Sequence, residues 1–268
     1  MRALRLQFIL LLVAMALAIT MPLRSRAQQP ASSTPTLSEI VSRMEAAREQ
    51  SKQTAPFQLT REYRMYHDDD AKPTSEVKAE ISVIPPHERE YKIIEANGSD
   101  RGEKVVRKIL DHESEADKVN PPPTALIPKN YDFALLGEDH FQGTRCFVLQ
   151  LKPKRKDPSL VDGRAWIDAN TYLVRKVEGQ MSKSPSWWVK DVRLTVLFGE
   201  IGGIWTQLSS NAIANVRIMG RYSVSGRATN VQTSAAMASN RQKKALGRVR
   251  RTSVPAPVLY NTGVIVAR

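Results

Sequence analysis

Few side chains in this sequence have the types and spacing that catalysis or metal binding requires. The four histidines are scattered, with no i, i+4 pair that would place two imidazoles on one helix face and with no cysteine partner. Three aspartates at positions 68–70 form a run, but they lack the spaced oxygen ligands of a calcium loop and are typical of a solvated turn. We therefore expect no metal site and no cofactor.

Nucleophilic chemistry has as little support in the sequence. Ser75 and Lys78 have the S-x-x-K spacing of penicillin-recognising enzymes, yet they lie in an alternating strand pattern and the companion motifs are missing. The G-x-S-x-G, P-loop, G-x-G-x-x-G and H-E-x-x-H patterns are also missing. Cys146 lies in a strand pattern, where a small buried hydrophobic side chain is favoured over a nucleophile. We expect no catalytic residue and no enzymatic activity.

The stretch from Tyr131 to Leu208 is a succession of alternating apolar and polar runs, each closed by a turn signal rich in Gly, Asn or Asp. Because successive side chains of a strand point to opposite faces, such runs predict an antiparallel meander with one apolar face. The alternation assigns nine side chains to a shared apolar interior, where they would line a ligand cavity: Phe147, Leu149, Leu151, Ile167, Leu173, Val192, Leu194, Val196 and Leu208.

The order of these hairpins resembles a known family. The runs "YDF..LG....G..C.VL.L.P" and "G.AW.D...YLV.K.EG", followed by a Trp-containing strand pair that ends "G..W", are similar to the LolA/LolB-like superfamily of periplasmic lipoprotein carriers, and most like its outer membrane lipoprotein-sorting members. The match extends from about Tyr131 to Tyr222. The resemblance implies an α+β, mainly β fold: an incomplete antiparallel β-barrel, or half-barrel, wrapped round a hydrophobic cavity, with helices packed on it or closing it.

The first residues have the features of an export signal. Arg2 and Arg5 precede an apolar stretch at 8–21 that is shorter than a membrane span, and small residues follow at 25–27. We expect a signal peptide at 1–27, a mature start near Gln28 and a periplasmic location; an uncleaved membrane anchor is the alternative. Residues 28–36 are rich in Pro, Ser, Thr and Gln and are expected to be a disordered linker.

The expected half-barrel domain spans residues 37–234 and begins with a helix. Thr36 and Glu39 form a capping-box signature, after which Leu37, Ile40 and Met44 fall on one helix face. That helix either packs on the sheet or closes the cavity mouth, and the sequence leaves both open. Strands are predicted over 57–67, 77–83 and 91–96, and a second amphipathic helix over 103–118.

The charge is unevenly distributed. Of the formal net charge of +13, four positive charges lie in the first 27 residues and seven from Ala235 onward, where there is no acidic residue, so the part between carries only about +2. This distribution argues against a nucleic-acid-binding face. We interpret 235–268 as a basic tail, which is either a disordered, soluble extension or an electrostatic tether to anionic membrane lipid or lipopolysaccharide phosphate.

Two functions compete for such a sheet. A coiled but unclosed sheet leaves an apolar concave side that a soluble protein must cover. The first interpretation is a non-enzymatic periplasmic carrier or sensor that holds an acyl chain or another hydrophobic ligand, such as a lipidated protein. The second is a structural or protein-interaction domain of the cell envelope whose cavity is filled by its own side chains. An envelope hydrolase is the least favoured alternative, and a monomer is expected.

Overall fold

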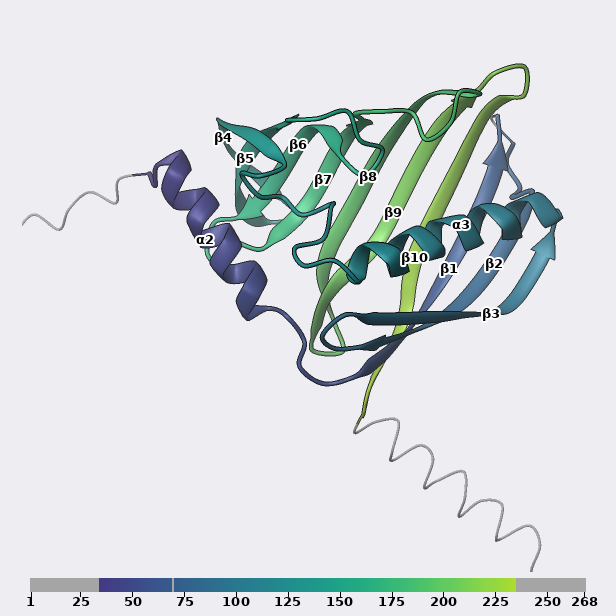
Figure 1. Cartoon of the computed structure of the whole chain (residues 1–268), viewed down its shortest axis with the longest axis horizontal. Helices are drawn as coiled ribbons and strands as arrows, with labels where there is room; N and C mark the ends of the chain where they lie inside the picture. The colour runs from purple at the N-terminus through teal and green to yellow at the C-terminus, as the bar shows by residue number, and fades with distance from the viewer. Residues whose placement is uncertain (1–33, 69, 235–268) are drawn as a thin grey trace, which may run out of the picture. The chain divides into compact units, whose positions relative to one another are not determined.

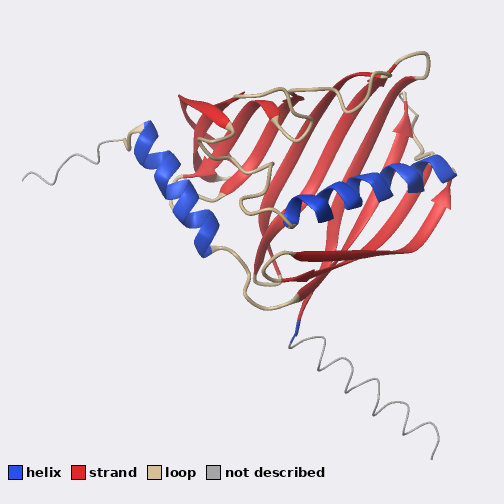
Figure 2. Cartoon of the chain, viewed as in Figure 1, coloured by secondary structure: helices blue, strands red, loops and turns tan. Residues whose placement is uncertain are grey.

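The structure is a computed structural model that describes residues 34–68 and 70–234. The predicted signal peptide, most of the predicted linker and the predicted basic tail lie outside the described residues. Within Leu37–Ser234 the chain forms one antiparallel sheet and two helices (Figures 1 and 2). Neither helix in the described residues is long and apolar enough to cross a bilayer.

Ten strands form a single sheet in the order β3-β2-β1-β10-β9-β8-β7-β6-β5-β4, in which every neighbouring pair is antiparallel. β3 and β4 are its two edges, so the sheet is open. The predicted class, a mainly β, incomplete antiparallel barrel, is confirmed. The strands are β1 (Phe57–His67), β2 (Ser75–Ile84), β3 (Glu88–Gly98), β4 (Tyr131–Phe141), β5 (Thr144–Pro153), β6 (Val161–Asp168), β7 (Val174–Met181), β8 (Val189–Ile201), β9 (Ile204–Val216) and β10 (Gly220–Thr233).

The register shows which side chains share a face across all ten strands. Residues paired directly across antiparallel strands project to the same side of a sheet. One such row crosses the whole sheet without a break, and its buried members toward either edge, such as Leu149 and Val77, lie on the side that carries the helices. Its members are Leu135, Leu149, Ala165, Val177, Val196, Ser210, Gly226, Tyr63, Val77 and Ala96.

Helix α2 (Leu37–Gln50) covers the β4 side of this inner face. Its buried residues are Ile40, Val41 and Met44, spaced so that they form one stripe. The predicted first helix is thus confirmed, and it packs on the sheet. We call the buried residues around it the α2 cluster: Ile40, Val41, Met44, Tyr131, Phe147, Leu149, Leu151, Leu160, Ala165, Ile167 and Val177.

Helix α3 (Asp100–Asp117) connects β3 to β4 and packs on β1, β2 and β3. Its buried Val106 and Leu110 are four residues apart, as the sequence predicted. The helix approaches the sheet closely at Gly102, where a Cβ would lie 2.1 Å from the Ser75 Oγ, so only glycine fits. We call the second group of buried residues the α3 cluster: Phe57, Leu59, Tyr63, Val77, Ala79, Ile81, Val106, Leu110 and Ile204.

The opposite, outer face carries a small cluster of its own. Cys146, Val148 and Trp166 are buried together there. The Lys176 ammonium lies 4.2 Å from the centre of the Trp166 ring, and the indole N–H donates to Asp139 at 2.9 Å. The prediction that Cys146 is buried is confirmed, and Trp166 lies on the face opposite Ile167.

The β6–β7 turn is organised by a buried carboxylate. Asp168 is 3% exposed; its Oδ1 accepts the backbone N–H groups of Asn170 (2.9 Å) and Thr171 (3.0 Å), and its Oδ2 accepts from Arg175 Nε (3.1 Å). Burial alone would raise the pKa of Asp168, but these donors together hold it below its ordinary value of 3.8. The ionised form therefore stabilises the folded state.

Replacing this carboxylate is expected to give a pH-dependent loss of stability. Because the folded-state pKa is depressed, the contribution of the charge is complete above the unfolded-state pKa and is lost as pH falls through the folded-state pKa. Asp168→Asn should lower the free energy of unfolding by about 1.5 to 3 kcal/mol at neutral pH. This difference in stability between the wild type and the variant should become smaller below about pH 4. Urea unfolding at several pH values measures the difference, with Asp132→Asn, at an exposed aspartate, as the control. A difference that stayed constant with pH would contradict the assignment.

Candidate ligand-binding face

The inner face of the central strands lies between the two clusters. The register joins Val177 of the α2 cluster to Tyr63 of the α3 cluster through Val196, Ser210 and Gly226, so both helices lie on the same side of the sheet. In between, six of the inward side chains are half-buried rather than buried. We call them the central face: Leu194, Val196, Ser210, Ala212, Ala214 and Val224.

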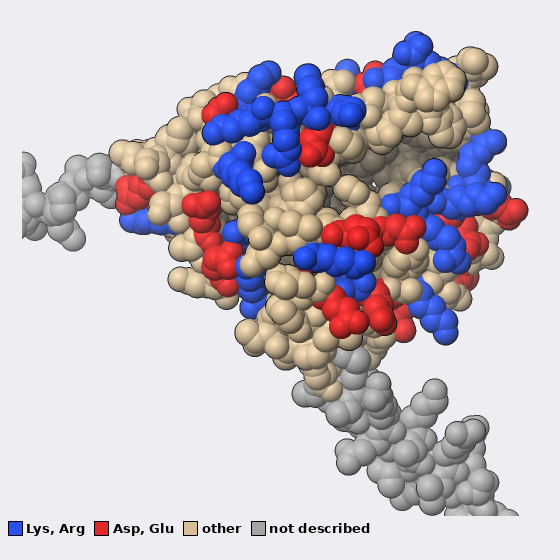
Figure 3. Space-filling model, in the orientation of Figure 1, with Lys and Arg blue, Asp and Glu red and all other residues tan. Residues whose placement is uncertain are grey.

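Small side chains form the floor of the central face. Ser210, Ala212 and Ala214 follow one another on the inner side of β9, while Leu194 on β8 and Val224 on β10 flank them. Among the described residues, the three on β9 belong to neither buried cluster. Figure 3 shows a hollow in this face of the molecule above α3. A strip of small residues between larger ones leaves room for an elongated apolar group.

Helix α3 spans this region and is anchored beyond it. In Figure 1 its C-terminal half is drawn across the central strands, and there His112 Nε2 lies 3.3 Å from Ser159 Oγ in the β5–β6 connection. Its N-terminal half lies over a narrow apolar void that has no room for water and is bordered by Val105, Val106 and Val224. The helix thus reaches from the β3 edge to the opposite half of the sheet.

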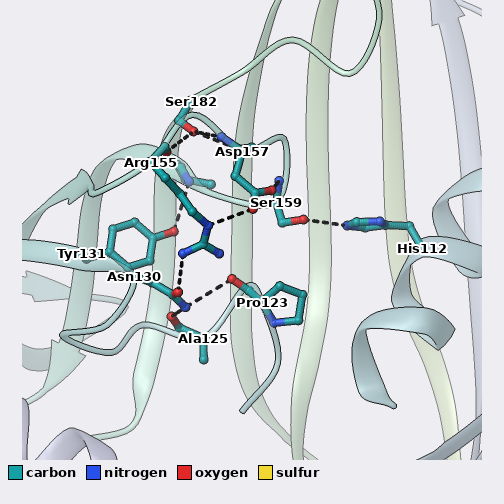
Figure 4. Close-up of polar contacts among 10 residues, drawn as sticks. His112, Pro123, Ala125, Asn130, Tyr131, Arg155, Asp157, Ser159 and Ser182 are labelled. Carbon is teal, nitrogen blue, oxygen red and sulfur yellow. Dashed lines mark hydrogen bonds and ion pairs between the residues drawn. The ribbon is translucent and has the colours of Figure 1, made fainter. Parts of the chain in front are cut away.

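The residues around the α3 contact in the β5–β6 connection form a polar network (Figure 4). The buried Asn130 donates to the Pro123 (3.2 Å) and Ala125 (2.8 Å) carbonyls and accepts from Arg155 Nη1 at 2.7 Å. These bonds tie the segment between α3 and β4 to the β5–β6 connection. The Tyr131 hydroxyl accepts the N–H of Val161 at 3.1 Å and fixes the same connection to the sheet. The β5–β6 connection that contacts α3 is therefore held in place by several hydrogen bonds.

Ser159, His112 and Asp157 meet in this network but are not arranged as a catalytic triad. Burial alone would raise the pKa of Asp157, but the Ser159 backbone N–H (2.8 Å) and Arg155 Nε (3.1 Å) hold it below its ordinary value. In a triad the acid would instead orient the imidazole. In the described residues no hydrogen bond joins a carboxylate to His112. The arrangement supports an architectural role for the pair.

The same C-terminal half of α3 is also held by buried charge, which the sequence analysis missed. Arg61, 2% exposed, projects inward from β1 and donates from Nη1 to both Glu113 oxygens at 2.9 and 3.0 Å. Arg89 donates to Glu113 (2.9 Å) and Asp117 (2.6 Å). Burial raises the pKa of Tyr63 to about 12, so its hydroxyl is neutral where it accepts from Arg61 at 3.1 Å. The sequence does contain a signal for this buried charge, because Arg61 occupies an inward position in the alternation of its strand.

Four of the nine predicted cavity residues lie together. Phe147, Leu149, Leu151 and Ile167 belong to the α2 cluster, and each is at most 2% exposed. Side chains of the same cluster on α2 cover them. Their inward orientation follows from this packing, whereas contact with a ligand stays a prediction.

The other five predicted residues lie elsewhere on the sheet. Val192, Leu194 and Val196 project inward from β8, and the last two belong to the central face. Leu173 precedes β7, where its carbonyl accepts the N–H of Asp168 at 3.0 Å, and Val174 rather than Leu173 packs on the α2 cluster. Leu208 lies at a register shift opposite Leu197 and Phe198, beside Gly199. A role for these five in ligand contact also stays a prediction.

No group of three or more His, Cys, Asp or Glu side chains in the described part of the chain is placed to hold a metal ion. Trp187 and Trp188, just before the start of β8, are 85% and 45% exposed. Trp205 is half-buried, and the Arg175 guanidinium lies 5.2 Å from its ring centre.

These features describe an open antiparallel half-barrel with a partly covered apolar inner face. No protein-family model matches the chain, and no curated protein matches it in sequence. Comparison with solved structures finds proteins of similar fold, at low sequence identity.

Three solved structures illustrate the similarity. An outer membrane lipoprotein-sorting protein domain from Vibrio parahaemolyticus has 10% identity and a TM-score of 0.43, with 72% of this chain and 92% of that chain covered. A LolA superfamily protein from Nitrosomonas europaea has 13% identity and a TM-score of 0.40, covering 74% and 94%. A DUF1329 family protein from Desulfovibrio piger has 11% identity and a TM-score of 0.38, covering 75% and 94%.

Proposed function

We propose that this chain is a non-enzymatic carrier or sensor in the periplasm that holds an acyl chain, or another hydrophobic ligand such as a lipidated protein, against the central face. The observation that supports this proposal is the gap between the two buried clusters. Leu194 and Val196 of β8, with Ala212 and Ala214 of β9, continue the apolar face, yet they are half-buried and belong to neither cluster. An apolar strip left open in this way favours a hydrophobic occupant.

The size of the expected binding energy suits a carrier. Each buried methylene contributes about 0.8 kcal/mol, so a long acyl chain contributes on the order of 10 kcal/mol before ordering costs are subtracted. Such a contribution is sufficient to take up a lipid chain and still release it to a better acceptor. The small side chains of β9 leave space for the chain, and α3 lies on the same side of the sheet to shield it from water.

The experiment is to measure palmitate and a hydrophobic fluorescent dye binding to two variants of adjacent residues. Ala212 faces inward, whereas Ile213 pairs with Arg193 and Ser223 on the outer face. We expect Ala212→Phe to weaken palmitate binding about tenfold or more, because displacing two methylenes costs about 1.6 kcal/mol. Ile213→Phe places the same aromatic side chain on the other face and should leave the affinity unchanged.

The result also separates this proposal from the second candidate, a structural or protein-interaction domain with a self-filled cavity. Mass spectrometry of lipids extracted from the purified native protein should find a bound lipid if the proposal holds. Absence of both co-purified lipid and palmitate binding in the wild-type protein would favour the self-filled domain. Equal weakening by both variants would show that the central face is not the binding surface.

A further inference from the structure

Two neighbouring loop ends present an exposed apolar tip at one end of the central strands. The tip comprises Trp187 and Trp188 in the connection between β7 and β8, and Ile218 in the turn between β9 and β10, which projects at the upper right of Figure 1. Trp187 is 85% exposed, and Ile218 is fully exposed. Leaving these large apolar side chains in water is unfavourable, and together they mark an interaction surface.

The two loop ends are held together rather than left to move independently. The Arg217 N–H donates to the Trp188 carbonyl at 2.7 Å, and Asn215 Nδ2 donates to Asp191 Oδ1 at 2.7 Å, which joins β9 to β8 just below the tip. The same residues border an open basin of about 1,080 Å³. A partner therefore meets the tryptophans and Ile218 as a single preformed surface.

The charges around the tip are mostly positive. Lys183, Lys190 and Arg217 are exposed, and no ion pair joins any of the three to an acidic side chain in the described residues. Of the nearby acids, Asp191 accepts from Asn215, and Asp68 accepts the backbone N–H of Arg221 at 2.9 Å. Figure 3 shows Lys and Arg atoms bordering uncharged surface at this end of the molecule.

We propose that this tip docks on the surface of an anionic lipid bilayer, with Trp187, Trp188 and Ile218 entering the headgroup region and Lys183, Lys190 and Arg217 facing lipid phosphates. Tryptophan is the residue that favours the membrane interface, since its ring is apolar and its N–H polar. Cations beside it add attraction to anionic lipid, about fivefold in affinity for each one.

The shape of the tip favours a bilayer over a protein partner. A standard protein interface buries about 800 Å² on each side, more than three side chains at two loop ends supply. A bilayer needs no matching shape and takes up apolar side chains in proportion to their buried area. Ser234, the last described residue before the predicted basic tail, follows the opposite end of the 14-residue strand β10, about 45 Å along the strand from its start.

The test is vesicle binding by the chain from Gln28 to Arg268, which keeps the tail and omits the expected export signal. Binding to phosphatidylglycerol vesicles is compared for the wild type, Trp187→Ser with Trp188→Ser, and Leu136→Ser as a control, since Leu136 is a 52% exposed apolar residue on β4. We expect the double variant to lose about tenfold or more in affinity, as removal of a buried large apolar side chain predicts. The control should bind as the wild type does.

A second measurement reports insertion directly and separates the tip from the tail. With Trp166 and Trp205 replaced by Phe, only Trp187 and Trp188 fluoresce, and phosphatidylglycerol brominated on its acyl chains should quench them. Arg217→Glu, which tests the tip if the double variant fails to fold, should also weaken binding at low salt. No wild-type binding, equal binding by all variants, or bound protein without quenching would each overturn the proposal; the first result would leave the tip to a protein partner.

Discussion

Leu149→Asp is expected to remove most of the stability of this protein. Leu149 has no exposed surface and lies in the α2 cluster, where the register pairs it with Leu135 on β4 and Ala165 on β6. An aspartate there loses the apolar contacts of the leucine and places a carboxylate where no water reaches it. The two effects together should lower the free energy of unfolding by on the order of 5 kcal/mol, enough to unfold many domains.

Urea unfolding followed by tryptophan fluorescence measures this change. Leu136→Asp is the matched control. Leu136 is 52% exposed, so its replacement should change the free energy of unfolding by only about 0.5 kcal/mol. A folded Leu149→Asp protein with the wild-type midpoint would show that the inner face has been assigned to the wrong side of the strand. Equal losses for both variants would point to a general effect of added negative charge.

The hairpins of this fold are readable from local sequence because each depends on neighbouring residues. The turn at Gln142 and Gly143 has positive φ at both positions, 50° and 78°, as a two-residue hairpin requires. Alternation along 147–151 then assigns the buried side correctly. Both signals lie within a few residues of the structure that they determine.

Irregularities in pairing set the limit of that approach. Between Trp166 and Ile167 the register shifts, so that Val174 rather than Leu173 enters the α2 cluster. A second shift, between Leu197 and Phe198, leaves Leu208 out of phase with the rest of β9. The position of a bulge depends on the partner strand, so the alternation within one strand does not predict it.

The candidate site is harder still to predict, because it consists of the inward residues that neither helix buries. Alternation shows that Val196 and Val177 both face inward, but only the positions of α2 and α3 make one half-buried and the other buried. Those positions depend on contacts between distant segments. Arg61 and Glu113, for example, are 52 residues apart, and nothing local distinguishes Glu113 from the other acids of its helix.

The second large effect is expected from Glu113→Gln, because it leaves a buried charge without its partner. The side chain of Arg61 is 3% exposed, and Glu113 accepts from both Arg61 and Arg89. Removing one member of a buried ion pair typically costs about 3 to 5 kcal/mol, and we expect a loss in that range. Glu115→Gln, whose side chain is 70% exposed, is the control and should cost at most about 0.5 kcal/mol.

Hydrogen exchange locates the effect and gives the prediction a second readout. Since Arg61 and Arg89 bind α3 to β1 and β3, the Glu113→Gln protein should exchange the amides of α3 faster than the wild type, while those of β5 and β6, in the α2 cluster, stay protected. Replacing Arg61 and Glu113 together by leucine removes both charges and should recover much of the loss. If the double replacement were as unstable as Glu113→Gln, lost packing rather than an unpaired Arg61 would be the cause, and α3 would not depend on this ion pair for its place on the sheet.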